Sequence, residues 1–175
     1  MAANTTDGVA VTHVSVIAED VEESTRFYTD VLGCNPIETP SLGRQHDFDA
    51  DEDISLQILE IGDQQLHLWN DPAHETEATR FAHFGIHVDD FEQVYHAAKE
   101  REIFAMIGVE SASPKLFEFN GMVQMYIRDP TGNLIEVDYP DIDQLDESVL
   151  ENVVSRETAG VDTTAYTPRL RNRIS

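Results

Sequence analysis

One strand and helix pattern occurs twice in this sequence, and this internal repeat constrains the fold more than any other feature. The first copy is an apolar stretch at residues 12–18, which opens on His13 and leads through an acidic pair into a helical pattern. The second copy, at residues 82–88, opens on His83 and leads in the same way into a second helical pattern. A duplicated unit that keeps a histidine at the same place predicts two equivalent modules that bring two metal ligands to one point.

The first module is predicted as a strand, a helix and three further strands. Residues 10–18 alternate loosely and are rich in valine, which is typical of a half-buried strand. Asp20 is the expected N-cap of a helix that ends at Gly33, and the apolar positions between them lie on one helical face. The turn pair Gly62-Asp63 predicts a hairpin. The three strands after the helix are expected at residues 34–38, 54–61 and 64–70, with a polar loop over 41–53.

The second module repeats that order. We expect a strand at 82–88, a helix at 90–101 and strands at 103–109, 122–128 and 134–139, with a loop through 111–114 and a turn at 129–133. The fold class is therefore α+β, built from two tandem βαβββ modules at residues 10–72 and 80–140 that together make one domain over 10–140. Residues 141–175 are an acidic C-terminal extension, helical to about residue 155, with a loose end that carries Arg169, Arg171 and Arg173.

The charge balance is strongly acidic and excludes some partners. The chain has 34 acidic and 11 basic residues, for a formal net charge of -23, and Lys99 and Lys115 are its only lysines. Such a surface repels nucleic acid and anionic membranes, so neither is expected as a partner. Acidity with so little lysine favours a halophilic protein, because salt screens the self-repulsion. Cys34 is the only cysteine, and we find no secretory signal or membrane span, so a cytoplasmic location is expected.

Four positions that match between the modules carry metal-ligand side chains. Successive residues of a strand point to opposite faces, so His67 shares a face with Gln65 and Trp69, and Glu136 shares a face with Leu134 and Asp138. His67 and Glu136 are then equivalent, as are His13 and His83. Imidazoles with one carboxylate suit a divalent ion such as Fe²⁺, Mn²⁺, Ni²⁺, Co²⁺ or Zn²⁺ and leave open positions for substrate.

The other histidines are weaker candidates for metal ligands or catalytic residues. His87 shares the expected face of His83, where it is either a pocket residue or a core histidine. His46, His74 and His96 fall in loops or on an exposed helix face, and we assign no role to them.

These residues resemble the vicinal oxygen chelate superfamily, which includes glyoxalase I, extradiol dioxygenases, fosfomycin-resistance proteins and bleomycin-binding proteins. The resemblance covers residues 10–140 and rests on the repeated unit, on His13 with the later Phe27-Tyr28 and Leu32-Gly33, and on the ending Asp129-Pro130-Thr131-Gly132-Asn133-Leu134-Ile135-Glu136. It implies a cup-shaped mixed sheet with a metal ion inside and a small substrate chelated through two neighbouring oxygens. It also implies a homodimer.

Within the superfamily, the stretch from Tyr126 to Gly132 followed by Glu136 looks like the extradiol dioxygenase signature. By that likeness, His13, His83 and Glu136 bind Fe²⁺ or Mn²⁺, Tyr126 contacts a substrate oxygen, and His67 takes a proton from the catechol. One feature departs from the signature: Phe117-Glu118-Phe119 stands where a further active-site histidine is expected.

Three other readings remain open. In a glyoxalase-type lyase, His67 would be a fourth metal ligand and Glu136 would remove a carbon-bound proton, with the ion stabilising an enediolate. The fosfomycin-resistance branch needs only His13, His83 and Glu136, although the body of the chain has no basic cluster to hold a phosphonate. A metal-free, bleomycin-type binding protein would use the same cup without those ligands.

Overall fold

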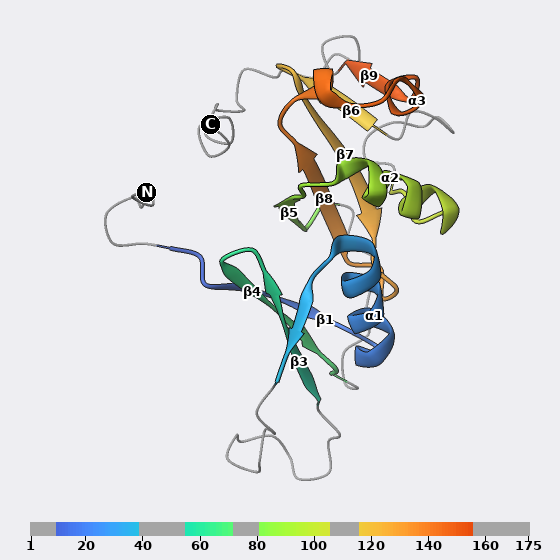
Figure 1. The fold of residues 1–175 in the computed structure, drawn as a ribbon. Helices are drawn as coiled ribbons and strands as arrows, with labels where there is room; N and C mark the ends of the chain where they lie inside the picture. Colours follow the sequence, from blue (N-terminus) through green and yellow to red (C-terminus); the bar gives the residue numbers. More distant parts are fainter. Residues whose placement is uncertain (1–9, 39–54, 72–80, 106–115, 156–175) are drawn as a thin grey trace. The chain divides into compact units, whose positions relative to one another are not determined.

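The computed structural model describes residues 10–38, 55–71, 81–105 and 116–155 (Figure 1). The chain forms two compact units, Met1–Glu77 and Ala78–Ser175, each with its own sheet. Several sequence-based expectations fall outside the described residues, namely the loops at 41–53 and 111–114, the end of the strand at 103–109, His46, His74 and the arginines of the last residues.

The first unit is a four-stranded mixed sheet with one helix. Its elements are β1 (His13–Ile17), α1 (Val21–Leu32), β2 (Asn35–Ile37), β3 (Leu56–Ile61) and β4 (Gln64–Trp69). The strand order is β1-β4-β3-β2, in which β1 and β4 are parallel and the other pairs are antiparallel. Gly62 sits in the β3–β4 turn with a φ of 58°, which glycine adopts without strain, and the predicted hairpin is confirmed.

Helix α1 begins and ends at the predicted caps. The Asp20 carboxylate accepts a hydrogen bond from the Glu23 backbone N–H, and Gly33 closes the helix in the left-handed conformation, with a φ of 69°. The buried residues of the helix fall at the spacing of one face, namely Ser24, Phe27, Tyr28 and Val31. Figure 1 shows α1 beside the strands of the first sheet, so this face covers one side of that sheet.

The second unit repeats this arrangement and extends it. Its elements are β5 (His83–His87), α2 (Phe91–Glu100), β6 (Leu116–Phe119), β7 (Met122–Arg128), β8 (Leu134–Tyr139), a short 3₁₀ turn (Ile142–Gln144), α3 (Glu147–Leu150) and β9 (Val153–Ser155). The strand order is β5-β8-β7-β6-β9, with β5 and β8 parallel and β6–β7 and β7–β8 antiparallel. The predicted α+β class with two tandem βαβββ units and mixed sheets is confirmed.

The repeat extends to the register of the strands. In the first unit Ser15 of β1 lies opposite His67 of β4, and in the second unit Gly85 of β5 lies opposite Glu136 of β8. His67 and Glu136 are therefore equivalent positions, as the parity of the strands predicted.

Two strands of the second unit were not predicted. Strand β6 comes after the predicted loop and pairs with β7. A strand was expected at 103–109 instead, and in the described part of that range only Phe104 pairs, through an isolated bridge with Ile127. The expected helix up to residue 155 is also wrong, because only Ile142–Gln144 and Glu147–Leu150 are helical and β9 then pairs in parallel with β6. Val153 and Val154 are β-branched, which favours a strand, and the edge of β6 offers their backbone a partner.

Apolar side chains of the helices and of the sheets form the cores, and in the second sheet both faces of β7 and β8 are buried. In the first unit Tyr28, Leu59, Leu66 and Leu68 are fully buried, and in the second unit Phe91, Tyr95, Met125 and Ile135 are. No helix among the described residues is both long enough and apolar enough to cross a membrane.

Cys34 lies directly after α1, and its thiol is buried. Burial raises the pKa of Cys34 to about 11, because the thiolate is poorly solvated there. We expect iodoacetamide to leave Cys34 unmodified at pH 8 in the folded protein and to modify it fully in denaturant, as mass spectrometry of the intact chain would record. Rapid labelling under native conditions would contradict this burial.

Candidate functional site

In the first unit, two histidines lie ring to ring on one face of the sheet. His13 is on β1, opposite Gln65 of the neighbouring β4, and His67 lies two residues further along β4, opposite Ser15. Their ring centroids are 4.4 Å apart and the planes differ by 7°. His13 Nδ1 is 3.0 Å from Thr12 Oγ1, and His67 Nε2 is 3.1 Å from Gln65 Oε1. The structure thus brings together two of the four predicted ligands.

The stacked rings affect each other electrostatically. The pKa of His67 is lowered from its ordinary value, first because partial burial disfavours the imidazolium and second because His13 beside it would repel a second positive charge. His67 is therefore a neutral imidazole at neutral pH, which is the form needed both by a metal ligand and by a base.

The influence of His13 on His67 can be measured directly. In the metal-free protein we expect the His67 ring to titrate below the ordinary histidine value, and to titrate closer to it in a His13→Ala variant, because one of the two causes is removed. Following the imidazole proton signals by NMR from pH 5 to 8 gives both midpoints. An unchanged His67 midpoint in the variant would mean that the stacked contact has no electrostatic effect.

The second unit holds the other two predicted ligands. His83 Nε2 on β5 is 3.3 Å from Glu136 Oε2 on β8. The opposite ring nitrogen, Nδ1, is 2.7 Å from the carbonyl oxygen of Phe81, so it carries a proton and donates it to that oxygen. Nε2 of a neutral ring then presents its lone pair to a carboxylate oxygen. This contact is favourable when the ring or the carboxyl group carries a further proton, or when both atoms bind a cation.

Tyr126 supports Glu136 from the neighbouring strand. Tyr126 on β7 lies opposite Glu136 in register, and its hydroxyl donates to Glu136 Oε2. Glu136 and Tyr126 are 5% and 4% exposed, so this bond is shielded from water. The Tyr126 ring also lies edge-on to His83, with centroids 5.8 Å apart. Tyr126, for which the resemblance implies contact with a substrate oxygen, is thus in direct contact with a predicted ligand.

A further polar pair, which the sequence did not indicate, lies beside Tyr126. Gln124 is fully buried on β7, and its amide donates to Asp138 Oδ1 on β8 at 3.2 Å. The Gln124 carbonyl oxygen is 3.4 Å from the Tyr126 hydroxyl. A buried Gln and Asp between apolar neighbours on predicted strands are the signals that could have found this pair, because such groups need partners.

The turn before β8 fixes the start of the strand that carries Glu136. Asp129 is buried, and its Oδ1 accepts hydrogen bonds from the backbone N–H groups of Thr131 and Asn133 at 3.0 and 2.8 Å. Its Oδ2 accepts a third bond from the Asn133 side chain at 2.8 Å. The predicted turn at 129–133 therefore positions β8 through one carboxylate.

His87 has its own contacts at the end of β5. Its Nδ1 is 3.1 Å from the carbonyl oxygen of Asp138, and its ring stacks on Tyr139. His96 is exposed on α2, next to Tyr95. Among the residues that the structure describes, no three His, Cys, Asp or Glu side chains gather around one point, so the candidate ligands form two pairs, one in each unit.

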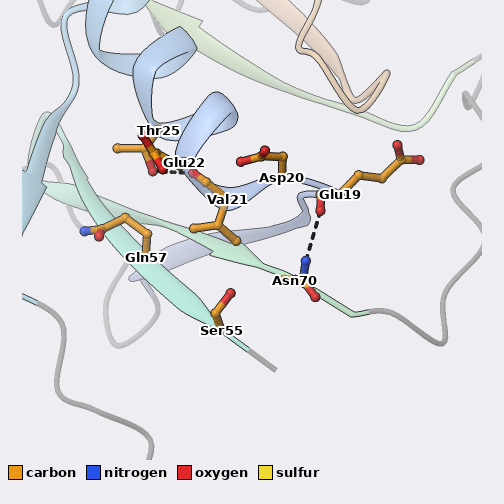
Figure 2. A pocket seen from close by; sticks show the side chains of 8 residues that line it. All are labelled: Glu19, Asp20, Val21, Glu22, Thr25, Ser55, Gln57 and Asn70. Atoms are coloured by element: carbon orange, nitrogen blue, oxygen red, sulfur yellow. Dashed lines mark hydrogen bonds between the residues drawn. The ribbon is translucent and has the colours of Figure 1, made fainter. Parts of the chain in front are cut away.

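A separate hollow in the first unit lies at the start of α1 (Figure 2). It is lined by Glu19, Asp20, Val21, Glu22, Thr25, Ser55, Gln57 and Asn70. Figure 2 shows the Asn70 amide donating to the Glu19 carbonyl across it, at 2.9 Å. None of the predicted site residues lines this hollow, and its carboxylates match the positive end of the α1 dipole, so we assign them to helix stability.

Comparison with known proteins identifies the fold. The family model described as the Glyoxalase/Bleomycin resistance protein/Dioxygenase superfamily matches residues 10–137. No curated protein sequence matches the chain at a significant level.

Among solved structures, a glyoxalase/bleomycin resistance protein/dioxygenase from Alicyclobacillus acidocaldarius is 23% identical, with a TM-score of 0.51, and the match covers 81% of this chain and 96% of that one. The fosfomycin resistance protein FosX from Listeria monocytogenes is 14% identical, with a TM-score of 0.53 and coverages of 82% and 98%. A glyoxalase family protein from Bacillus anthracis is 18% identical, with a TM-score of 0.53 and coverages of 74% and 93%. At these identities the likeness concerns the fold alone.

Proposed function

Because this chain belongs to the Glyoxalase/Bleomycin resistance protein/Dioxygenase superfamily, we propose that it is a divalent-metal-dependent enzyme acting on a small vicinal-oxygen substrate. In this proposal the two units belong to one domain over residues 10–140. His13, His83 and Glu136 bind the ion, and His67 stands beside them as a base or as a fourth ligand.

The contact that best supports the proposal is the one between His83 and Glu136. A lone pair on Nε2 and a carboxylate oxygen at 3.3 Å fit around a cation, and the Nδ1 contact with the Phe81 carbonyl is the kind of support that orients ligating histidines. In the first unit, His13 and His67 stand at the positions equivalent to His83 and Glu136. The repeat therefore places metal-ligand side chains at matching positions of both units.

The reaction that we place first is an extradiol-type dioxygenation. Fe²⁺ or Mn²⁺ would bring reactivity toward dioxygen, which no protein side chain supplies. His67 is neutral at neutral pH because of its lowered pKa, so it can accept a proton from a substrate hydroxyl. The Tyr126 hydroxyl donates to Glu136, and its oxygen keeps lone pairs with which to accept a hydrogen bond from the substrate.

The second candidate is a glyoxalase I-like lyase. It is favoured by the position of Glu136, whose carboxylate is shielded from water beside His83 and would be placed to remove a carbon-bound proton. Here His67 is a fourth ligand, and Ni²⁺, Co²⁺ or Zn²⁺ would stabilise the enediolate. A metal-free binding protein of the bleomycin-resistance kind is the third candidate, in which the His83–Glu136 contact would have a structural role only.

The proposal also covers the cellular compartment, the class of substrate and the oligomeric state. The acidic composition supports a salt-rich cytoplasm and a small-molecule substrate in place of nucleic acid or a membrane surface. A homodimer is proposed from the family alone. Residues 141–175 are proposed as an extension outside the catalytic domain, although the described part of it adds β9 to the second sheet.

Anaerobic purification in high salt, followed by metal analysis, tests the metal first. Parallel assays with a catechol plus oxygen and with a hemithioacetal then separate the two reactions, because ring fission gives a yellow product and the lyase gives thioester absorbance. A protein that binds no divalent ion stoichiometrically would refute the proposal.

A further inference from the structure

A chain of buried polar side chains crosses the second sheet and ends at the predicted ligand Glu136. It consists of two facing pairs on β7 and β8, namely Gln124 with Asp138 and Tyr126 with Glu136. At the places equivalent to Gln124, Asp138 and Tyr126 the first unit has apolar residues, namely Leu56, Trp69 and Ile58. Burying polar groups costs free energy that their hydrogen bonds have to offset. Because the first copy of the repeat forms its sheet without these groups, we expect their role in the site and not in the fold.

Asp138 determines which way the Gln124 amide points. The Gln124 side chain is fully buried, and its NH₂ group donates to Asp138 Oδ1 at 3.2 Å. A carboxylate only accepts hydrogen bonds, so it holds the NH₂ end of the amide and leaves the carbonyl end to the other neighbour. The carbonyl oxygen, Oε1, is 3.4 Å from the Tyr126 hydroxyl. Gln124 therefore offers Tyr126 an acceptor and not a donor.

The Tyr126 hydroxyl in turn affects how the Glu136 carboxylate is turned. The last torsion of a glutamate side chain has broad energy minima, so hydrogen bonds decide its value. Tyr126 donates to Glu136 Oε2, and the same oxygen is 3.3 Å from His83 Nε2, where the proposed ion would bind. A change at the Tyr126 hydroxyl therefore reaches the atoms of the proposed metal site.

We infer that Gln124 is a positioning residue for metal binding, which acts on Glu136 through Tyr126. Its carbonyl oxygen is a second acceptor for the single proton of the Tyr126 hydroxyl, and it helps to hold that hydroxyl beside Glu136. Asp138 keeps the carbonyl oxygen turned toward Tyr126. This inference rests on the proposed function, because Glu136 is one of its metal ligands.

The Mn²⁺ affinity of the full-length protein in high salt, measured by calorimetric titration, tests the inference. Gln124→Met keeps the approximate size of the side chain and removes both polar groups, and Gln124→Asn keeps an amide but withdraws it from Tyr126. Tyr126→Phe removes the hydroxyl through which Gln124 acts, and a double variant combines it with Gln124→Met. Met125→Ala is the control, because Met125 is fully buried on the same strand and faces the other side of the sheet.

We expect Tyr126→Phe to lower Mn²⁺ affinity by about tenfold or more, the usual effect of losing a partner of a metal ligand. Gln124→Met should lower it by about two- to tenfold, as for one hydrogen bond, and the double variant should bind no more weakly than Tyr126→Phe alone. The EPR spectrum of bound Mn²⁺ reports the arrangement of its ligands. It should change in Gln124→Met and remain that of the parent in Met125→Ala, although both variants lower the melting temperature.

Parent-like Mn²⁺ affinity in the Gln124 variants would overturn the inference, and Gln124→Asn alone decides if Gln124→Met does not fold. A further loss of affinity when Gln124→Met is added to Tyr126→Phe would overturn it as well. In either case the parent would still bind Mn²⁺, and the proposed function would stand. A parent that binds no Mn²⁺ would instead refute the proposed function, and this inference with it.

Discussion

Replacing Glu136 by glutamine is expected to reduce affinity for the divalent ion by more than about 100-fold, since even partners that only support a ligand contribute 10- to 100-fold. The amide keeps the size of the side chain and can still accept the hydrogen bond from Tyr126, so the fold should persist. It loses the negative charge that faces His83 Nε2 at 3.3 Å. Turnover should fall with the metal content, which elemental analysis and calorimetric titration would quantify.

Glu100→Gln is the matched control for this variant. Glu100 is the last residue of α2, is exposed, and undergoes the same chemical change. It should bind metal and melt as the parent does. If Glu136→Gln retained the metal affinity of the parent, Glu136 would not be a ligand, and the metal-centred mechanism would have to be abandoned.

The second large effect is a loss of turnover when His67 is replaced by alanine. In the dioxygenase that we place first, His67→Ala should keep its metal and lose turnover by about 10²- to 10⁴-fold, the usual contribution of a positioned acid or base. We expect this loss because His67 can act as a base: partial burial and the stacked His13 ring lower its pKa and favour the neutral imidazole. Metal analysis and single-turnover kinetics on the same preparation measure the two effects separately.

His96→Ala is the control for His67→Ala, since His96 is an exposed histidine on α2. It should leave metal content and turnover unchanged. Loss of the metal together with turnover in His67→Ala would instead make His67 a fourth ligand and move the glyoxalase-type reaction to first place.

Local sequence signals predicted the elements that surround the candidate site. Asp20 and Gly33 bound α1, and Asp90 caps α2 through a hydrogen bond from the Gln93 backbone N–H. The strands at 122–128 and 134–139 match β7 and β8 residue for residue. These signals succeed because capping, turn formation and alternation depend on neighbouring residues only.

Strand β9 was missed because its formation depends on a distant partner. Strand β9 has three residues and follows two short helical turns, so its pattern alone is too brief to identify a strand. It forms where β6 offers an unpaired edge. The role of Gln124 was missed for the same reason, since its partner, Asp138, lies on the next strand.

The sequence by itself determined the repeated βαβββ order, the faces of the strands and the equivalence of His67 with Glu136, because a two-residue alternation fixes the face of every strand residue. Only the tertiary structure decided that the His13 and His67 rings stack, that the Tyr126 hydroxyl donates to Glu136, and that the Gln124 amide donates to Asp138. Those contacts depend on side-chain rotamers and on pairing between strands far apart in the chain, and no local pattern of residues encodes either.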